Sequence, residues 1–259
     1  MEGCETLSSA IGGAVKASVG GKDAAVAFSG GLDSGIVAAF VKRHASSATL
    51  YTAGVADAYD VRESESASRL LDMPWRHLLI TDGDLLDCVA DMVRITGTTS
   101  PVTLSFEIPL YYVAKHCRED TIIGGQGADE LFAGFSKYVG LDEVALGEAM
   151  GADMAVLLNQ TLAHERAVAS NFGKTVAYPY LDRNVVDFVS RLDVGDLMPS
   201  EVRKGCLRDV AEHIGYPEIA AKKKKAAQYG CGAMHRLRAI AKSRGVTVKG
   251  LIDSIAGGV

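Results

Sequence analysis

The sequence has 259 residues, of which 48% are hydrophobic and 23% charged, a balance typical of a soluble globular protein with a sizeable core. The net charge of −5 argues against a nucleic-acid partner, and no apolar run approaches the ~20 residues of a membrane span. Five scattered cysteines form no C-x-x-C pair, which argues against a zinc site and suits a reducing cytosol. Because the N-terminus also lacks a signal-peptide pattern, we expect a cytoplasmic protein.

Short apolar runs in the first half of the chain predict strands, and the segments between them predict helices. The predicted strands are Asp23–Phe28, Ala48–Val55, Arg76–Ile80 and Asp120–Gly125. Apolar residues at helical spacing predict helices over residues 34–44, 59–71, 84–96 and 105–117. Strands that alternate with helices in this way are typical of an α/β fold with a parallel, doubly wound sheet.

The pattern changes after about Gly140, where helical spacing dominates to the end of the chain. No stretch rich in Pro, Gly or Ser separates the two halves. We therefore expect a single domain over residues 1–259. Its α/β part would span about residues 20–140, and a mainly helical part over about 141–259 would close the site.

The first predicted strand runs directly into Ser29-Gly-Gly-Leu-Asp-Ser34, between two apolar elements. Gly30 and Gly31 would let the backbone turn sharply and approach a ligand, and the N–H groups that open the next helix attract phosphate. Ser29 and Ser34 can donate hydroxyl hydrogen bonds. Asp33 would repel phosphate unless a cation lies between them, so it points to Mg²⁺. A glycine turn with ordinary helix capping is the alternative interpretation.

The fourth predicted strand ends in a second glycine-rich loop, which is followed by Asp129 and Glu130. Parallel strands present their carboxyl ends at the same rim of the sheet, so Asp33 and Asp129 should lie close together. Two carboxylates there can share a cation that neutralises a leaving pyrophosphate. Acids that only complement the helix dipole are the alternative interpretation.

These loops carry a resemblance to a known family. S-G-G-x-D-S is similar to the pyrophosphate loop of the N-type ATP pyrophosphatases, and residues 125–135 resemble the G-x-G-x-D-E-x-F-x-G-[YF] motif of the asparagine synthetase and β-lactam synthetase branch. Three further matches follow in order: P-[FY]-L-D at 179–182, K-x-x-L-R at 204–208 and a basic segment at 222–232. The resemblance spans Asp23 to Gly232. It implies an adenine nucleotide alpha hydrolase-like fold and cleavage of ATP between its α- and β-phosphates.

Transferred position by position, the resemblance also implies roles for single residues. The main chain of Phe28 and the strand end near Ala53 would face adenine, while Lys224 would stabilise negative charge in the transition state. Gly124 and Gly125 would lie close to the nucleotide, and Asp33 and Asp129 would hold Mg²⁺. Pyrophosphate would be held by Ser29, Gly30, Gly31, Asp33 and Ser34.

Gln126 departs from the asparagine synthetase motif, in which this position is commonly a glutamate that resembles a general base. A glutamine side chain cannot take up a proton at neutral pH. Glu107, Glu130 and Tyr138 are candidates to replace that base, and Gln126 could instead bind a substrate amide or carboxylate.

A second departure concerns nitrogen supply. Only about twenty residues precede the first predicted strand, so we expect no glutaminase domain in this chain, and Cys4 does not replace its nucleophile. Nitrogen would then come from free ammonia, an amine or a separate partner glutaminase.

The resemblance implies an asparagine synthetase-like ligase that uses ATP and Mg²⁺ to adenylate a carboxylate, which then passes to ammonia or an amine. The alternatives are a related enzyme that activates a tRNA base or another amide oxygen, and a nucleotide sensor without catalysis. The acidity of the chain argues against RNA, and Asp33, Asp129 and Lys224 argue against a sensor. The acceptor and the oligomeric state, a homodimer included, stay open.

Overall fold

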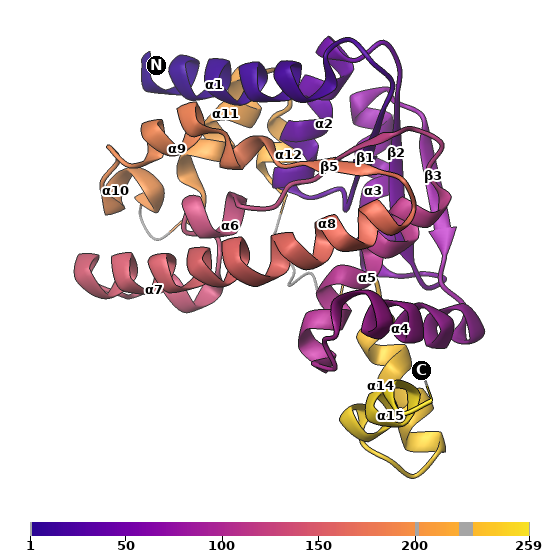
Figure 1. Cartoon of the computed structure of the whole chain (residues 1–259). Helices are drawn as coiled ribbons and strands as arrows, with labels where there is room; N and C mark the ends of the chain where they lie inside the picture. The colour runs from indigo at the N-terminus through magenta and orange to yellow at the C-terminus, as the bar shows by residue number, and fades with distance from the viewer. Residues whose placement is uncertain (1, 200–201, 223–229, 259) are drawn as a thin grey trace.

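The computed structural model describes residues 2–199, 202–222 and 230–258. Within them, five parallel strands form one sheet in the order β3-β2-β1-β4-β5 (Figure 1). Their bounds are β1 Ala24–Ala27, β2 Ala48–Gly54, β3 Trp75–Leu79, β4 Thr121–Ile123 and β5 Thr175–Ala177. The predicted parallel sheet is thereby confirmed, and its first four strands are those expected, each shorter or shifted by one to three residues.

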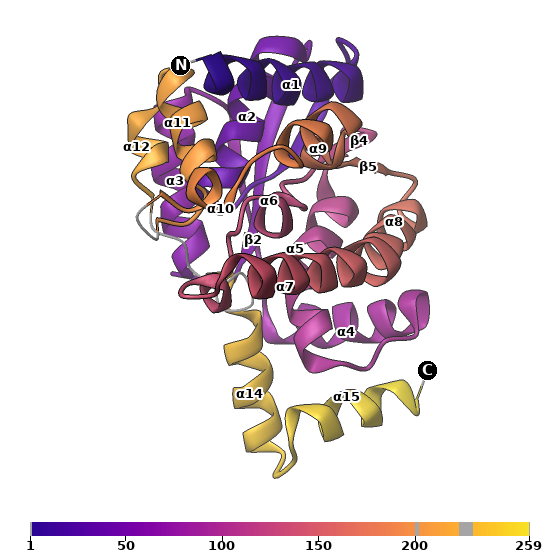
Figure 2. The same ribbon diagram turned by 90° about the vertical axis from the view of Figure 1, so that its left-hand side faces the viewer.

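Both faces of the sheet are covered by helices. One face packs against α1 (Glu2–Val19), α2 (Leu32–His44), α3 (Tyr59–Leu71) and α11 (Gly205–His213) in a continuous core. The other packs against α5 (Pro101–His116), which is in turn covered by α4 (Asp82–Thr96), α8 (Leu162–Asn171), α14 (Ala233–Ser243) and α15 (Val248–Ala256). Figure 2 shows α14 and α15 at the end of the molecule away from α1.

The strands read as unbroken apolar runs because neither face meets water. Ala24 and Val26 point into the core beneath α1 and α2, whereas Ala25 points into the core beneath α5. Side chains alternate between the two faces of a strand, so a doubly covered strand needs apolar residues at every position. This arrangement makes the expected doubly wound fold.

The second half of the chain is mainly helical, as expected. It comprises α6 (Ala128–Leu131), α7 (Glu143–Val156), α8, α9 (Arg183–Val189), α10 (Val194–Leu197), α11, α12 (Pro217–Ala220), α14 and α15. A π-helical turn at Leu157–Thr161 joins α7 to α8, so the two form one long element across the front of Figure 1. Two elements were not predicted, the amino-terminal helix α1 and the edge strand β5. The division into two parts of one domain stays a prediction.

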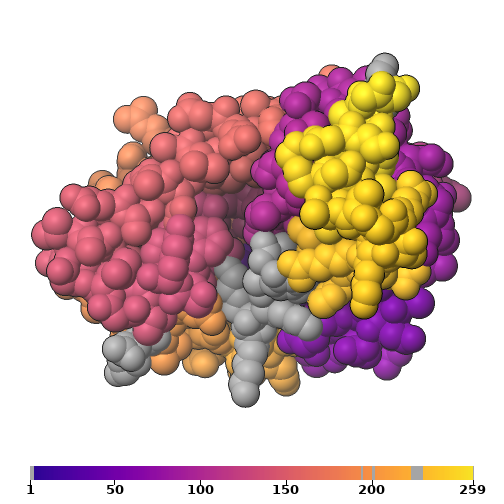
Figure 3. All heavy atoms as spheres, turned by 90° about the horizontal axis from the view of Figure 1, so that it is seen from below, coloured from indigo at the N-terminus to yellow at the C-terminus, as the bar shows by residue number. Residues whose placement is uncertain are grey.

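The strand order places a topological switch point between β1 and β4. The chain passes from β1 outward to β2 and β3, then crosses back to β4 and outward to β5. Loops that follow β1 and β4 therefore turn in opposite directions and leave a crevice at the carboxyl ends of the strands, where α/β sheets bind ligands. Figure 3 shows the surface hollowed on this side, between the regions of α7 and α14–α15. Among the described helices, none combines the length and apolar character needed to cross a membrane.

Candidate active site

The loop between β1 and α2 allows its backbone to pack closely against neighbouring segments. Gly30 has a φ of +73°, and a Cβ atom on it would lie 2.5 Å from the backbone of Glu63, so glycine is required there. The hydroxyls of Ser29 and Ser34 lie 3.2 Å apart, and the Ser29 N–H donates to the Ser34 hydroxyl at 3.3 Å. Helix α2 begins at Leu32 without a side-chain cap, so its amino end offers backbone donors and a positive dipole to an anion.

The glycine loop after β4 lies against this first loop. A Cβ atom on Gly125 would lie 3.5 Å from both the Asp33 Cβ and the Ser34 nitrogen. Gly127, with a φ of +90°, packs its α-carbon against Leu181, where a Cβ atom would lie 2.5 Å from a methyl group. The two glycine-rich loops thus meet at the switch point, as the sequence predicted.

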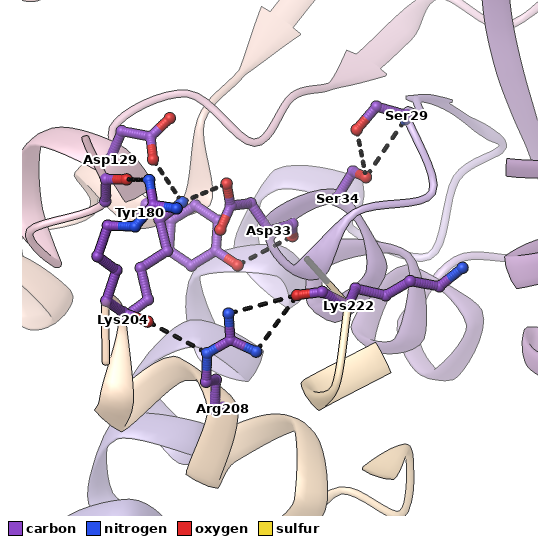
Figure 4. A network of polar contacts seen from close by, with 10 residues as sticks. Ser29, Asp33, Ser34, Asp129, Tyr180, Lys204, Arg208 and Lys222 are labelled. Carbon is purple, nitrogen blue, oxygen red and sulfur yellow. Dashed lines mark hydrogen bonds and ion pairs between the residues drawn. The ribbon is translucent and has the colours of Figure 1, made fainter. Parts of the chain in front are cut away.

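Lys204 lies between the two carboxylates that the sequence brought together. Its Nζ is 2.5 Å from Asp33 Oδ2 and 2.7 Å from Asp129 Oδ1, and its side chain is only 4% exposed (Figure 4). Burial alone would lower the pKa of the ammonium, but the two carboxylates outweigh burial and raise it, so the group is held charged. One buried cation therefore lies where Asp33 and Asp129 converge.

The neighbours of this cluster fix it in place. Lys204 has a left-handed backbone with a φ of +59°, an uncommon conformation for a residue other than glycine. Gly134 borders it closely, because a Cβ atom there would lie 2.0 Å from Asp129 Oδ1 and 2.2 Å from Lys204 Cε. The buried Tyr180 hydroxyl donates to the Asp33 carbonyl at 3.0 Å. The P-[FY]-L-D segment therefore supports the first loop from beneath.

Arg208 fastens the chain on the other side of the cluster. Its guanidinium donates to the carbonyl oxygen of Lys222 (Figure 4). It also donates to the carbonyl oxygens of Arg203 and Ala220. The Lys222 ammonium in turn pairs with Glu63 Oε2 at 2.5 Å, on α3. Through Arg208, the K-x-x-L-R segment thus holds Lys222 in place, and these two residues add positive charge at the rim of the first loop.

Two cavities open on this rim and share Ser29, Asp33, Asp60 and Asp129. The first has a volume of about 130 Å³. The second, of about 200 Å³, extends across the carboxyl ends of β1, β2, β4 and β5. Basic residues line the first cavity, namely Arg203, Lys204, Arg208 and Lys222.

A buried carboxylate belongs to the second cavity. Glu165, on α8, is 3% exposed; the Gln126 amide donates to its Oε1 at 2.5 Å, and the Tyr178 hydroxyl donates to its Oε2 at 2.7 Å. Burial raises the pKa of Glu165, whereas these two hydrogen bonds oppose the shift. Glu107, on α5, is close enough that burial and the Glu165 charge raise its pKa to about 8.

The structure gives each expected site residue of the two loops a place on these cavities. The first cavity is lined by Ser29, Gly30, Gly31, Asp33 and Asp129, and the second by Phe28, Ser29, Asp33, Ser34, Ala53, Gly124, Gly125, Gln126 and Asp129. The Phe28 N–H already donates to the Tyr51 carbonyl at 2.9 Å, and its carbonyl accepts from Thr52. Lys224 lies outside the described residues.

The three candidates to replace a base at position 126 lie in different places. Tyr138 is fully buried, its hydroxyl donates to Asp153, and it is not among the residues that line either cavity. Glu130 is not among the residues that line either cavity. Glu107 lies beside Glu165 and stays compatible with a role near Gln126.

Two residues at the site, Lys204 and Glu165, were given no role by sequence reasoning. Lys204 opens the K-x-x-L-R match, which was a usable signal. Glu165 shares the buried face of α8 with Leu162, Val168 and Ala169, so an acid at an apolar position was the available signal.

Comparison with known proteins identifies a family. The model of the asparagine synthase family matches residues 6–144 and 137–249. A Methanocaldococcus jannaschii protein assigned as a glutamine-hydrolysing asparagine synthetase is 25% identical over 96% of this chain and 53% of its own length. Asparagine synthetase B of Escherichia coli is 23% identical over 80% of this chain and 41% of its own length.

The chain thus spans about half, or less, of the curated relatives that it matches. Among solved structures, an NMN synthetase from Francisella tularensis is 13% identical, covering 98% of this chain and 86% of its own, with a TM-score of 0.47. That likeness is too low to support a conclusion about function.

Proposed function

The chain belongs to the asparagine synthase family, and from that premise we propose that it is an ATP-dependent, AMP-forming ligase that joins a carboxylate to ammonia or an amine. One observation carries the proposal. The S-G-G-x-D-S loop, the second glycine loop and the buried Lys204 meet at the switch point of a parallel sheet. This arrangement offers backbone donors and fixed cations to a polyphosphate.

The first cavity would hold the pyrophosphate portion of ATP. Ser29, Ser34 and the amino end of α2 lie on one side of it, and Arg203, Lys204, Arg208 and Lys222 line the other. Positive charge held in place before the reaction stabilises the charge that develops on a leaving pyrophosphate. Lys224 keeps its predicted role beside the α-phosphate as part of this proposal.

The second cavity would hold adenosine and the acceptor, because it joins the strand ends near Phe28 and Ala53 to Gln126. A carboxylate oxygen of the acceptor attacks the α-phosphorus of ATP, and the bond to the bridging oxygen breaks with its electron pair leaving on pyrophosphate. The nitrogen of ammonia or an amine then attacks the acyl carbon. AMP leaves with the electrons of the carbon–oxygen bond, and the nitrogen gives up a proton.

Mg²⁺ fits the donor set of the site. Asp33 Oδ2 and Asp129 Oδ1 are held by the Lys204 ammonium, so Mg²⁺ would bind beside it; Asp33 Oδ1 is buried without a hydrogen-bond partner among the described residues and is available to such an ion. The described part of the chain gathers no group of three or more His, Cys, Asp or Glu side chains that could hold a metal ion. Two carboxylates suffice for Mg²⁺ that is also bound by phosphates, and the ion would neutralise charge on the leaving pyrophosphate.

Pyrophosphate release tests the proposal. Purified protein with Mg-ATP and ammonia is assayed against a panel of carboxylic acids, and we expect at least one acid to support equal release of AMP and pyrophosphate. Release of ADP and phosphate, or no turnover with any acid, would contradict an AMP-forming ligase.

Asp33→Asn should lower kcat/KM about 10²–10³-fold, since it removes one of the two carboxylates that hold the cations facing the leaving pyrophosphate. Asp187→Asn, an equivalent change on the exposed side of α9, is the matched control and should turn over as the wild type does. Wild-type turnover of Asp33→Asn with its fold intact would remove Asp33 from the mechanism. The cytoplasmic location, the partner glutaminase and the homodimer stay predictions from the sequence.

A further inference from the structure

Gln126, Glu165 and Tyr178 form one wall of the second cavity, and the proposed binding of ATP gives these three side chains no role. Glu165 is enclosed there, and it accepts a hydrogen bond from an amide on one oxygen and from a phenol on the other. Both donors fix the plane of the carboxylate, so the glutamine at position 126 acts here as a positioning residue. Each carboxylate oxygen has more than one lone-pair direction, so Glu165 can accept further hydrogen bonds from a ligand.

A second carboxylate lies behind this wall. Glu107 is 1% exposed, and its helix neighbours Phe106 and Leu110 line the same cavity. His164 Nδ1 lies 3.0 Å from Glu107 Oε1, whereas Oε2 is buried with no hydrogen-bond partner in the described part of the chain. A buried carboxylate oxygen without a donor is costly, so it would be stabilised by a donor or a cation.

The charges that line the second cavity have one sign. Its described lining contains the acids Asp33, Asp60, Asp129 and Glu165 and includes no lysine, arginine or histidine. Lys204 pairs with Asp33 and Asp129 on the side shared with the first cavity. At the far wall the basic groups lie outside the lining, Arg166 over the Tyr178 ring at 6.0 Å and His164 bound to Glu107. A ligand in this cavity therefore meets negative potential on the side away from the phosphates.

We propose that Glu165, backed by Glu107 and oriented by Gln126 and Tyr178, binds a protonated amino group of the second substrate. The proposal rests on the proposed function and names the substrate class: a cationic primary amine or ammonium ion, bound opposite the nucleotide. An ammonium group brings three donors, which match a carboxylate with free lone pairs. Aspartate is then a poor ligand, because one of its carboxylates would face Glu165, and the described lining of this cavity contains no basic side chain.

Binding of a simple amine in the absence of ATP tests the proposal. We would titrate the protein with ethylammonium chloride by calorimetry at pH 8, with sodium chloride of equal ionic strength as the blank. We expect saturable binding that Glu165→Gln and Glu107→Gln each weaken about tenfold or more. Both changes preserve side-chain shape, and circular dichroism checks the fold. Glu143→Gln, on the exposed start of α7, is the matched control and should bind as the wild type does.

A pH series separates this site from a purely structural acid pair. A carboxyl pair that holds a proton must release it to a cation, so affinity for ethylammonium should rise several-fold between pH 6 and 8, with proton release detectable in buffers of different ionisation enthalpy. Glu107→Gln should flatten that rise. The groups that face the pair from α5, α8 and the end of β5 are Glu107, His164, Glu165, Arg166 and Tyr178.

Each outcome decides the matter. Absence of saturable amine binding, binding that is unchanged in both glutamine variants, or tighter binding of aspartate than of ethylammonium would overturn the proposal. Amine binding that persists in a protein unable to release pyrophosphate would uphold this site while contradicting the ligase. Pyrophosphate release without amine binding would support the ligase and contradict the amine site.

Discussion

The two cavities at the switch point share one rim but differ in the charges that face them. Four basic side chains line the first; of these, Lys204 pairs with Asp33 and Asp129, and Lys222 pairs with Glu63. The charged residues in the described lining of the second are all acids, and one of them, Glu165 at the far wall, accepts hydrogen bonds from neutral donors. If both proposals hold, one sheet edge separates an anionic ligand from a cationic one within a short distance.

The comparison also shows two ways of burying charge. Lys204 is compensated by two carboxylates, so its ion pairs are complete. Glu165 and Glu107 have no cation within the described part of the chain; burial raises the pKa of both, and the charge of Glu165 raises that of Glu107 further. Substitutions should therefore affect the first cavity through lost ion pairs and the second through altered titration.

The largest effect should follow from Lys204→Met, which leaves two partly buried carboxylates side by side without their buried cation. We expect the free energy of unfolding to fall by about 3–5 kcal/mol, measured by urea denaturation. Lys249→Met, which breaks an exposed pair with Asp253, is the control and should cost less than about 1 kcal/mol. Adding Asp33→Asn and Asp129→Asn to Lys204→Met should restore part of the loss. Equal stability of Lys204→Met and wild type would mean that the cluster is not tightly paired.

Gly134→Ala should come next, because the new methyl group would overlap Asp129 Oδ1 and Lys204 Cε. We expect a loss of about 3 kcal/mol in the free energy of unfolding, together with reduced pyrophosphate release. Gly147→Ala on α7 is the matched control. A Cβ atom there meets nothing within 4 Å, so the change should stabilise the helix by about 0.5–1 kcal/mol. Equal free energies of unfolding for Gly134→Ala and Gly147→Ala would contradict the close packing of Lys204 against Asp129.

A smaller effect is expected at the second cavity, where the titration of Glu107 should make the free energy of unfolding depend on pH. Burial and Glu165 raise the pKa of Glu107 from 4.5 to about 8 in the native protein. Between these values the unfolded chain loses a proton that the native state keeps, so this contribution to stability is complete below about pH 4.5 and is lost as pH rises to about 8. Glu107→Gln removes it.

Relative to wild type, the free energy of unfolding of Glu107→Gln should therefore increase by roughly 2 kcal/mol from pH 6 to pH 8. Denaturation curves at several pH values measure this difference, and Glu143→Gln should run parallel to the wild type. A difference between Glu107→Gln and wild type that does not change with pH would show that Glu107 titrates normally.

Much of the fold could be predicted from local pattern. Alternation of apolar runs with helical spacing indicated the first four strands and the parallel sheet, because each such element buries a recognisable face. Strand β5 was not predicted, because it has only three residues at a sheet edge, with Thr175 exposed, and so short a segment shows almost no periodic pattern. Helix α1 was missed although Leu7, Ile11 and Val15 repeat at a spacing of four residues and are all fully buried.

At the site, sequence reasoning located the residues that stand in local motifs and missed contacts that depend on distant partners. The glycine loops, Asp33 and Asp129 stand in recognisable motifs. The Gln126–Glu165 pair joins residues 39 positions apart, and the Lys204–Asp33 pair joins residues 171 apart. No pattern within a single element specifies such partners. From the sequence alone Gln126 could be interpreted as the loss of a base or as a substrate-binding amide, but the carboxylate that its amide contacts, Glu165, could not be identified.

The support of Asp33 by Tyr180 and Lys204 has a consequence for how the protein folds. These contacts span 147 and 171 residues of sequence, so they form only after the chain has closed very long loops. A nascent chain that ends before Tyr180 would contain the S-G-G-x-D-S loop but would lack its buried cation and its support. Competence to bind nucleotide should then appear late in refolding, after most helical structure has formed.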